Sequence, residues 1–185
     1  MATEKQKNKT ICVYCGASSD VDELYKTAAY ECGEQLAKAD MDVVYGGGRV
    51  GLMGIVADAA LEHGADVIGI IPAHLQVREP KHQHLTETHI VESMHDRKAL
   101  MEKRSDGFLI LPGGLGTMDE TFEILTWKTL GLHDKPIVLL NVNGYWDNFI
   151  ALVEGIIDAG FAKEEHRDFH VFDTMEGAVR FYKDL

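Results

Sequence analysis

The segment that most constrains the fold is a glycine-rich stretch at 111–120, which reads Leu-Pro-Gly-Gly-Leu-Gly-Thr-Met-Asp-Glu. It follows a short, uninterrupted apolar run, typical of a strand buried on both faces of a parallel sheet. A helical pattern then extends to about Leu130, and Thr117 is its expected N-cap, with Asp119 and Glu120 in the first turn. A strand, a glycine turn and a helix in this order predict a unit of an α/β sheet.

The glycines of this turn leave its backbone open to a ligand. Gly113, Gly114 and Gly116 can adopt positive φ and carry no Cβ, so their N–H groups can point at an anion near the positive end of the helix. A phosphate is the natural ligand for such a turn. Two plainer explanations stay open at this point: the glycines make only a tight turn, and the two acids only complement the helix dipole.

The rest of the chain repeats the alternation of short apolar runs and helical patterns. Its 185 residues suffice for one substantial core, so we expect a single domain over 1–185, with 1–8 as a flexible tail. Short loops between the elements predict an α/β fold with a doubly wound, mainly parallel sheet and helices on both faces. Strands are expected near 9–15, 42–45, 66–71, 85–91, 107–111, 136–142 and 170–173, and helices near 21–39, up to 63, 93–104, 117–130, 145–159 and 175–182.

The charge balance and the termini bear on partners and location. A formal net charge of −12 disfavours binding to nucleic acid or to an anionic membrane surface, although one phosphate can still occupy a local site. The charged start of the chain has no apolar region behind it, and no apolar run is long enough to span a bilayer. We therefore expect a cytoplasmic protein.

The cysteines and histidines do not predict a metal or redox centre. Cys12 and Cys15 form a C-x-x-C, but a strand sends them to opposite faces of the sheet. His82 and His84 lack cysteine partners and helical i, i+4 spacing, so a solvated or ligand-covering loop is the favoured interpretation. We expect no metal and no cofactor.

A second glycine-rich turn follows the second predicted strand. Gly46, Gly48 and Gly51 satisfy G-x-G-x-x-G, the pattern of dinucleotide sites, which also need an acid at the end of the next strand. Asp66 has the right spacing but stands at the start of that strand. We therefore favour a close-approach turn lining the same crevice over an NAD site. Ser18 follows the first strand and is either a ligand contact or, with its neighbour, an N-cap.

Arg97 interrupts an apolar stripe in the helix expected at 93–104. Met94 and Met101 share its face, because they stand three residues before it and four after it. Burying a guanidinium is costly unless it meets a carboxylate or phosphate, so Arg97 is either paired, part of a site, or extended along the edge of the stripe.

Together these segments resemble a known family. The 112–120 segment matches P-G-G-x-G-T-x-x-E without a departure, the signature of the Lonely Guy (LOG) family of cytokinin riboside 5′-monophosphate phosphoribohydrolases, which also appears in proteins labelled possible lysine decarboxylases. Matching text surrounds it at 15–19, 45–48, 51–54, 94–98 and 125–127. The resemblance covers nearly the whole chain, and several matches in the right order are more specific than one glycine loop.

The resemblance implies a Rossmann-like homodimer that hydrolyses the N-glycosidic bond of a cytokinin riboside 5′-monophosphate or AMP, giving free base and ribose 5-phosphate. It implies Glu120 and Arg97 as the catalytic pair. The expected substrate contacts are Glu79, Lys98, Gly113, Gly114, Leu115, Gly116, Thr117, Met118, Asp119 and Thr126, together with Ser18, Gly47 and Gly48. Pyridoxal phosphate would need a Schiff-base lysine, and no lysine stands out for that role.

The implied chemistry agrees with the residues. A carboxylate can stabilise an oxocarbenium-like transition state and activate water, which suits Glu120, while the glycine turn would fix the 5′-phosphate. The alternative is a nucleotide-binding or carrier protein on the same fold without turnover. A carrier has no need of a carboxylate beside an anion site, so the pair of Glu120 and Arg97 favours the enzyme.

Overall fold

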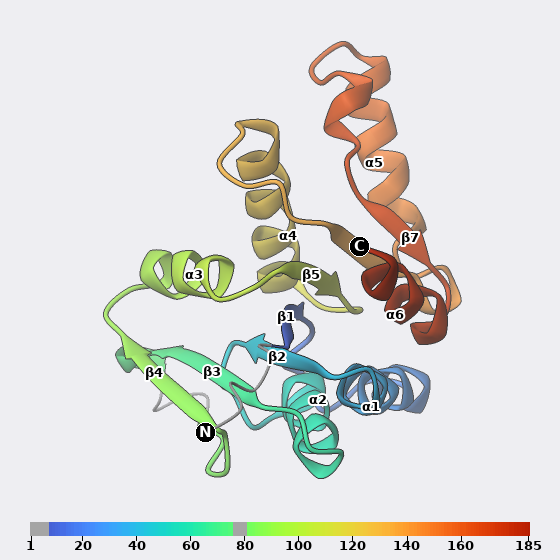
Figure 1. Ribbon diagram of the computed structural model, residues 1–185. Coiled ribbons are helices and arrows are strands. Elements are labelled where there is room, and N and C mark those ends of the chain that lie inside the picture. Colours follow the sequence, from blue (N-terminus) through green and yellow to red (C-terminus); the bar gives the residue numbers. More distant parts are fainter. Residues whose placement is uncertain (1–7, 76–80) are drawn as a thin grey trace, which may run out of the picture.

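A single parallel sheet contains all the strands of the computed structural model, which describes residues 8–75 and 81–185 (Figure 1). Its order is β4-β3-β2-β1-β5-β6-β7, and every neighbouring pair is parallel. The doubly wound α/β fold predicted from the sequence is confirmed. The strands are β1 Lys9–Tyr14, β2 Met41–Tyr45, β3 Val67–Pro72, β4 Glu87–Val91, β5 Gly107–Ile110, β6 Ile137–Leu140 and β7 His170–Phe172.

Helices cover both faces of the sheet and bury two apolar cores. One face carries α1 Glu23–Lys38, α2 Gly51–Glu62 and α6 Met175–Asp184, whose apolar sides meet around Leu36 and Tyr182. The other carries α3 Met94–Lys103, α4 Leu115–Thr129 and α5 Asp147–Asp158, packed around Met101, Ile124 and Phe149. Short 3-10 turns lie at Ala73–Leu75, Val142–Gly144 and Glu164–His166. Among the described residues, no helix has the length and apolar character needed to cross a membrane.

The centre of the sheet holds the topological switch point. The chain runs outward from β1 to β4, then returns through α3 to place β5 on the other side of β1. The two central strands stay joined beyond their ends, because Leu111 N–H donates to the Tyr14 carbonyl at 2.9 Å and Gly16 N–H to the Pro112 carbonyl at 3.0 Å. The loops that follow them then diverge, which opens a crevice at the carboxyl edge of the sheet.

The start of α4 differs from the prediction. Gly114, not Thr117, is the N-cap, and the helix begins at Leu115. Thr117 is instead buried, because its side chain packs back against Gly113. Asp119 and Glu120 consequently lie beyond the first turn, so complementing the helix dipole does not explain them.

The start of α1 also differs. Asp22 is its N-cap, with a carboxylate that accepts from Leu24 N–H at 2.9 Å, so the interpretation of Ser18 or Ser19 as caps is wrong. Ser18 Oγ accepts from Asp20 N–H, whereas Ser19 Oγ accepts from Gly51 N–H. Of the expected N-terminal tail, residues 1–7 lie outside the described part of the chain, and Asn8 donates to the Asp42 carboxylate at 3.3 Å.

Candidate active site

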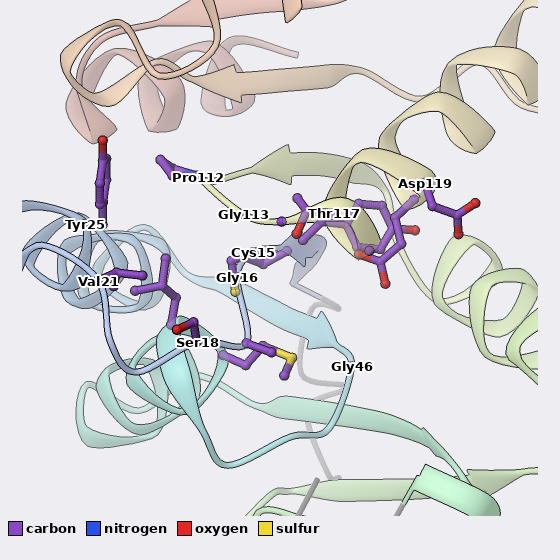
Figure 2. Close-up of a pocket in the computed structure, with 18 of the residues that line it drawn as sticks. Cys15, Gly16, Ser18, Val21, Tyr25, Gly46, Pro112, Gly113, Thr117 and Asp119 are labelled. Carbon is purple, nitrogen blue, oxygen red and sulfur yellow. The ribbon is translucent and has the colours of Figure 1, made fainter. Parts of the chain in front are cut away.

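A cavity of about 680 Å³ opens at the carboxyl ends of β1, β2 and β5. Figure 2 shows that its walls come from separate segments: Gly113 and Thr117 stand on the side of β5 and α4, while Ser18 and Gly46 follow β1 and β2. This volume is in the range of small-molecule sites. The switch point therefore brings both glycine-rich turns of the sequence to one cavity.

The glycine turn before α4 has two kinds of glycine. A Cβ on Gly113 would lie 2.1 Å from Thr117 Oγ1, so close packing of the turn requires glycine there. A Cβ on Gly114 or Gly116 would meet no atom within 4 Å, and both residues line the cavity. The phenol of Tyr145 secures the turn by donating to the Gly113 carbonyl at 2.6 Å. Open space therefore lies beside Gly114 and Gly116 at the start of α4, where an anion would be favoured.

Arg97 reaches the cavity from α3 and is only 6% exposed. Its Nε donates to the Ile70 carbonyl at 3.1 Å and its Nη2 to the Gly46 carbonyl at 2.9 Å, while Nη1 lies 3.9 Å from Met94 Sδ. Carbonyl oxygens thus stabilise this buried guanidinium on the side of β2 and β3. The sequence left three possibilities for Arg97: an ion pair, a place in a site, or a side chain extended along the edge of the apolar stripe. Its position in the cavity supports a place in a site.

The second glycine-rich turn makes room for that arginine. A Cβ on Gly46 would lie 1.8 Å from Arg97 Nη2, and Gly47 has φ +76°. Gly51, at φ +62°, would place a Cβ 2.3 Å from the carbonyl carbon of Ala17. Asp66 precedes β3, at the edge of the sheet opposite the cavity, so the acid required of a dinucleotide site is not at this edge.

Three carboxylates lie on α4, at Asp119, Glu120 and Glu123. Lys98 pairs with Asp119 and Glu123, at 3.0 Å to each, and so ties α3 to α4. Glu120 lines the cavity. Burial raises the pKa of the Cys15 thiol well above its ordinary value, and the charges of Cys32 and Glu120 raise it further. Cys15 is therefore an unreactive thiol.

The structure brings together eight of the predicted site residues. They line the cavity: Arg97, Glu120, Ser18, Gly113, Gly114, Gly116, Thr117 and Asp119. Six others lie outside its described lining: Lys98, Leu115, Met118, Thr126, Gly47 and Gly48. Leu115 is 89% exposed, and Met118 packs against the core. Glu79 lies outside the described residues. The substrate contacts assigned to all of these residues stay predictions.

Sequence reasoning missed the apolar wall of the cavity. Tyr25 and Tyr145 stand edge to face, with ring centroids 5.5 Å apart, and Leu52, Met53 and Met94 complete the wall. Apolar residues at helical spacing carry the same sequence signal as core residues, so only the position of these residues beside the crevice distinguishes them.

Cys12, Cys15 and His82 are buried in the fold, whereas His84 is exposed. Cys12 and Cys15 belong to the cores on opposite faces of the sheet, as predicted. The interpretation of His82 as solvated is wrong, because the residue is 4% exposed and bonded to Asp58 at 2.8 Å, whereas His84 is exposed. A ligand-covering role for this loop stays a prediction. No cluster of three or more potential metal ligands occurs within 8–75 and 81–185.

Comparison with known proteins agrees with this architecture. The family model described as possible lysine decarboxylase matches residues 53–181. A cytokinin riboside 5′-monophosphate phosphoribohydrolase of Arabidopsis thaliana is 42% identical over 181 residues, covering 98% of this chain and 84% of that protein. A probable enzyme of the same name from Oryza sativa subsp. japonica is 46% identical over 170 residues, covering 92% and 74%.

The molybdenum cofactor carrier protein of Chlamydomonas reinhardtii is a structural neighbour. It superposes with a TM-score of 0.73 at 21% identity, over 96% of this chain and 97% of that one. At this level of identity the likeness shows the fold alone. By contrast, the sequence relatives match at more than 40% identity over most of the chain. The chain belongs to the LOG family of cytokinin riboside 5′-monophosphate phosphoribohydrolases, the family that the possible lysine decarboxylase model also describes.

Proposed function

We propose that this protein hydrolyses the N-glycosidic bond of a cytokinin riboside 5′-monophosphate or AMP, releasing free base and ribose 5-phosphate. The observation that carries the proposal is the meeting of Glu120, Arg97 and the open glycine turn of α4 in one cavity. The names of the sequence relatives support the same activity.

The glycine turn is the proposed phosphate site. The first N–H groups of α4 have no partner within the helix, and open space lies over Gly114 and Gly116. A phosphate bound there would meet backbone donors and the positive end of the helix dipole. Binding energy from this non-reacting group would position the ribose, so nucleosides without a phosphate should react poorly.

Glu120 is the proposed catalytic carboxylate. Water adds to C1′ of the ribose while the C1′–N bond breaks, and the base leaves with a proton. A carboxylate beside C1′ stabilises the positive charge that develops on the sugar and removes a proton from the attacking water. Arg97, fixed by two carbonyls, would supply the positive charge that orients this carboxylate.

Decarboxylation of lysine finds no support in the cavity. Pyridoxal phosphate chemistry would require a lysine within reach of the ring. Among the described residues that line the cavity there is no lysine, and Lys98 is engaged by two carboxylates of α4. A carrier function would use the phosphate site but would give no role to Glu120.

Chromatography of the reaction products tests the proposal. The protein should release free base from AMP or isopentenyladenosine monophosphate, and much less from the matching nucleosides. Glu120→Gln should lower turnover by about 10²–10⁴-fold, the usual loss for a positioned general base. The thermal midpoint of the variant should stay close to wild type, as its fold control. Saturable nucleotide binding without release of base would instead establish the carrier.

We further propose that the protein is a cytoplasmic homodimer. The support for the dimer is an exposed apolar surface on α4 and the turn after it, which we name the α4 surface and define as Leu115, Phe122, Leu130 and Leu132. Leu115 directly adjoins the glycines of the phosphate turn, so a partner on this surface would also border the mouth of the cavity.

A further inference from the structure

His82 is a buried histidine outside the cavity. Its side chain is 3% exposed, although Lys81, Gln83 and His84 around it are exposed. Nδ1 accepts from the backbone N–H of His84 at 3.2 Å, so the ring carries its proton on Nε2. That Nε2 donates to the Asp58 carboxylate at 2.8 Å. The imidazole is therefore held at both nitrogens, in one orientation.

The backbone at this histidine is hydrogen-bonded to the glycine turn at 46–48. His82 N–H donates to the Gly47 carbonyl at 3.1 Å, and Lys81 forms an antiparallel bridge with Gly48. From β2 below, the Tyr45 hydroxyl donates to the Gly48 carbonyl at 3.1 Å. Gly47 lies at φ +76° without a side chain, so these contacts fix a backbone that would otherwise have wide freedom.

The same turn also contains the Gly46 carbonyl, which is hydrogen-bonded to Arg97. The Gly46 carbonyl accepts from Arg97 Nη2, and its peptide plane joins the next plane at the Gly47 Cα atom. Because the two planes share this atom, a displacement of the Gly47–Gly48 plane also shifts the Gly46 carbonyl unless φ and ψ of Gly47 change to compensate. A chain of contacts thus runs from Asp58 on α2 through the His82 ring and backbone to Gly47, Gly46 and the guanidinium in the cavity.

We propose that His82 and Asp58 are positioning residues that set the place of the Arg97 guanidinium in the active site. Neither residue lines the cavity, so they act only through the 46–48 turn. The role of Arg97 in turnover rests on the proposed function, whereas its position does not. Displacing a catalytic group by about 1 Å can cost on the order of 10²-fold in rate, so a modest shift of the turn matters.

Asp58→Ala is the decisive variant, because 71% of this side chain is exposed and its loss leaves the core intact. It should lower kcat by about 10- to 100-fold with little change in KM. Asp58→Asn keeps an oxygen acceptor, and His82→Gln keeps a donor near Nε2, so both should retain most of the activity. Glu62→Ala removes the other exposed acid of α2, which contacts Tyr30 instead, and should behave as wild type.

A double-mutant cycle separates a positioning role from a general structural one. If Asp58 acts through Arg97, adding Asp58→Ala to Arg97→Lys should change kcat by less than about twofold, since coupled sites are not additive. If the double variant instead loses kcat by the product of the two single-variant losses, the proposal is overturned. Equal kcat for Asp58→Ala and wild type would overturn it too, while leaving the proposed hydrolase in place.

An NMR measurement tests the proposal without any turnover. The Arg97 Nε–H signal, identified by its loss in Arg97→Lys, should be protected from exchange by the bond to the Ile70 carbonyl. Asp58→Ala should shift this signal and speed its exchange, whereas Glu62→Ala should leave it in place. A signal unmoved by Asp58→Ala refutes the positioning role even in a protein that releases no base.

Discussion

Gly46 and Gly116 line the same cavity, but a methyl group would meet different surroundings at each. At Gly46 it would overlap the Arg97 guanidinium, whereas at Gly116 it would enter open space beside the start of α4. The first glycine is required by the protein's own packing. The second leaves room that, under the proposed function, the substrate phosphate occupies.

These two positions predict different kinetic losses. Gly46→Ala should lower kcat by about 10²-fold because it displaces the arginine, while Gly116→Ala should chiefly raise KM because its methyl group crowds the phosphate. Gly155→Ala, in open space on α5, should change neither constant. Steady-state kinetics of the three variants with AMP checks this. Equal losses of kcat at 46 and 116 would contradict the distinction.

Single residues also mark the limit of what the sequence could reveal. The glycines, Arg97 and Glu120 stand in separate segments of the chain, so the family resemblance, and not their spacing in the sequence, implied that they share a site. Thr117 was assigned as a cap because threonine suits an N-cap, yet burial of its side chain against Gly113 moved the helix start to Leu115. His82 looked solvated because its partner, Asp58, is distant in sequence.

At the scale of elements, the tie between α3 and α4 is an ion-pair cluster. Lys98 is 6% exposed and bonds to Glu123 and Asp119. Burial by itself lowers the pKa of the Lys98 ammonium, but the bonds to the two carboxylates outweigh it and raise the pKa above its ordinary value. The cluster holds the helix of Arg97 against the helix of Glu120.

Lys98→Met should therefore destabilise the fold. It leaves Glu123, whose side chain is 21% exposed, without its cation, at a cost of about 1–3 kcal/mol in the free energy of unfolding. Urea denaturation measures this, with the exposed Lys103→Met as control. Because the pKa is raised on folding, the stabilisation should be full below about pH 10.4 and fade as pH rises through the folded value. A difference that persists unchanged at higher pH would contradict the ion pair.

Element boundaries were predictable where caps or glycines were strong signals. The capping box of Ser93 and Asp96 starts α3 at Met94, close to the expected start at 93. Apolar runs placed the central strands β1, β3, β5 and β6 to within a few residues, because strands buried on both faces carry nearly continuous apolar sequence, whereas the edge strands β4 and β7 are largely exposed and carry a weaker signal. The order of the strands in the sheet could be learned only from the structure, because apolar runs do not indicate which strands are neighbours.

For the whole molecule, the α4 surface predicts the oligomeric state. Leu130 and Leu132 are each 66% exposed, and exposed apolar side chains are typical of interaction sites. Light scattering should give twice the 20.6 kDa chain mass, and Leu130→Asp with Leu132→Asp should give a single chain with unchanged circular dichroism. Phe161→Asp, an equally drastic change at a residue 88% exposed and outside this surface, should stay dimeric. A monomeric wild type contradicts the assignment.

The switch point at the centre of the sheet also affects when the cavity forms during folding. β1 pairs with β5 across a long loop of chain, so the cavity between them is absent until that loop has closed. Under the proposed function, a nucleotide in the cavity binds the folded state alone, so at about 100 times its Kd it adds about 2.7 kcal/mol to the free energy of global unfolding. Amide hydrogens of β1 and β5 that exchange through global unfolding should then exchange about 100-fold more slowly. Under the proposed function, the substrate therefore stabilises the pairing of β1 with β5, the strand pairing that is separated by the greatest length of chain.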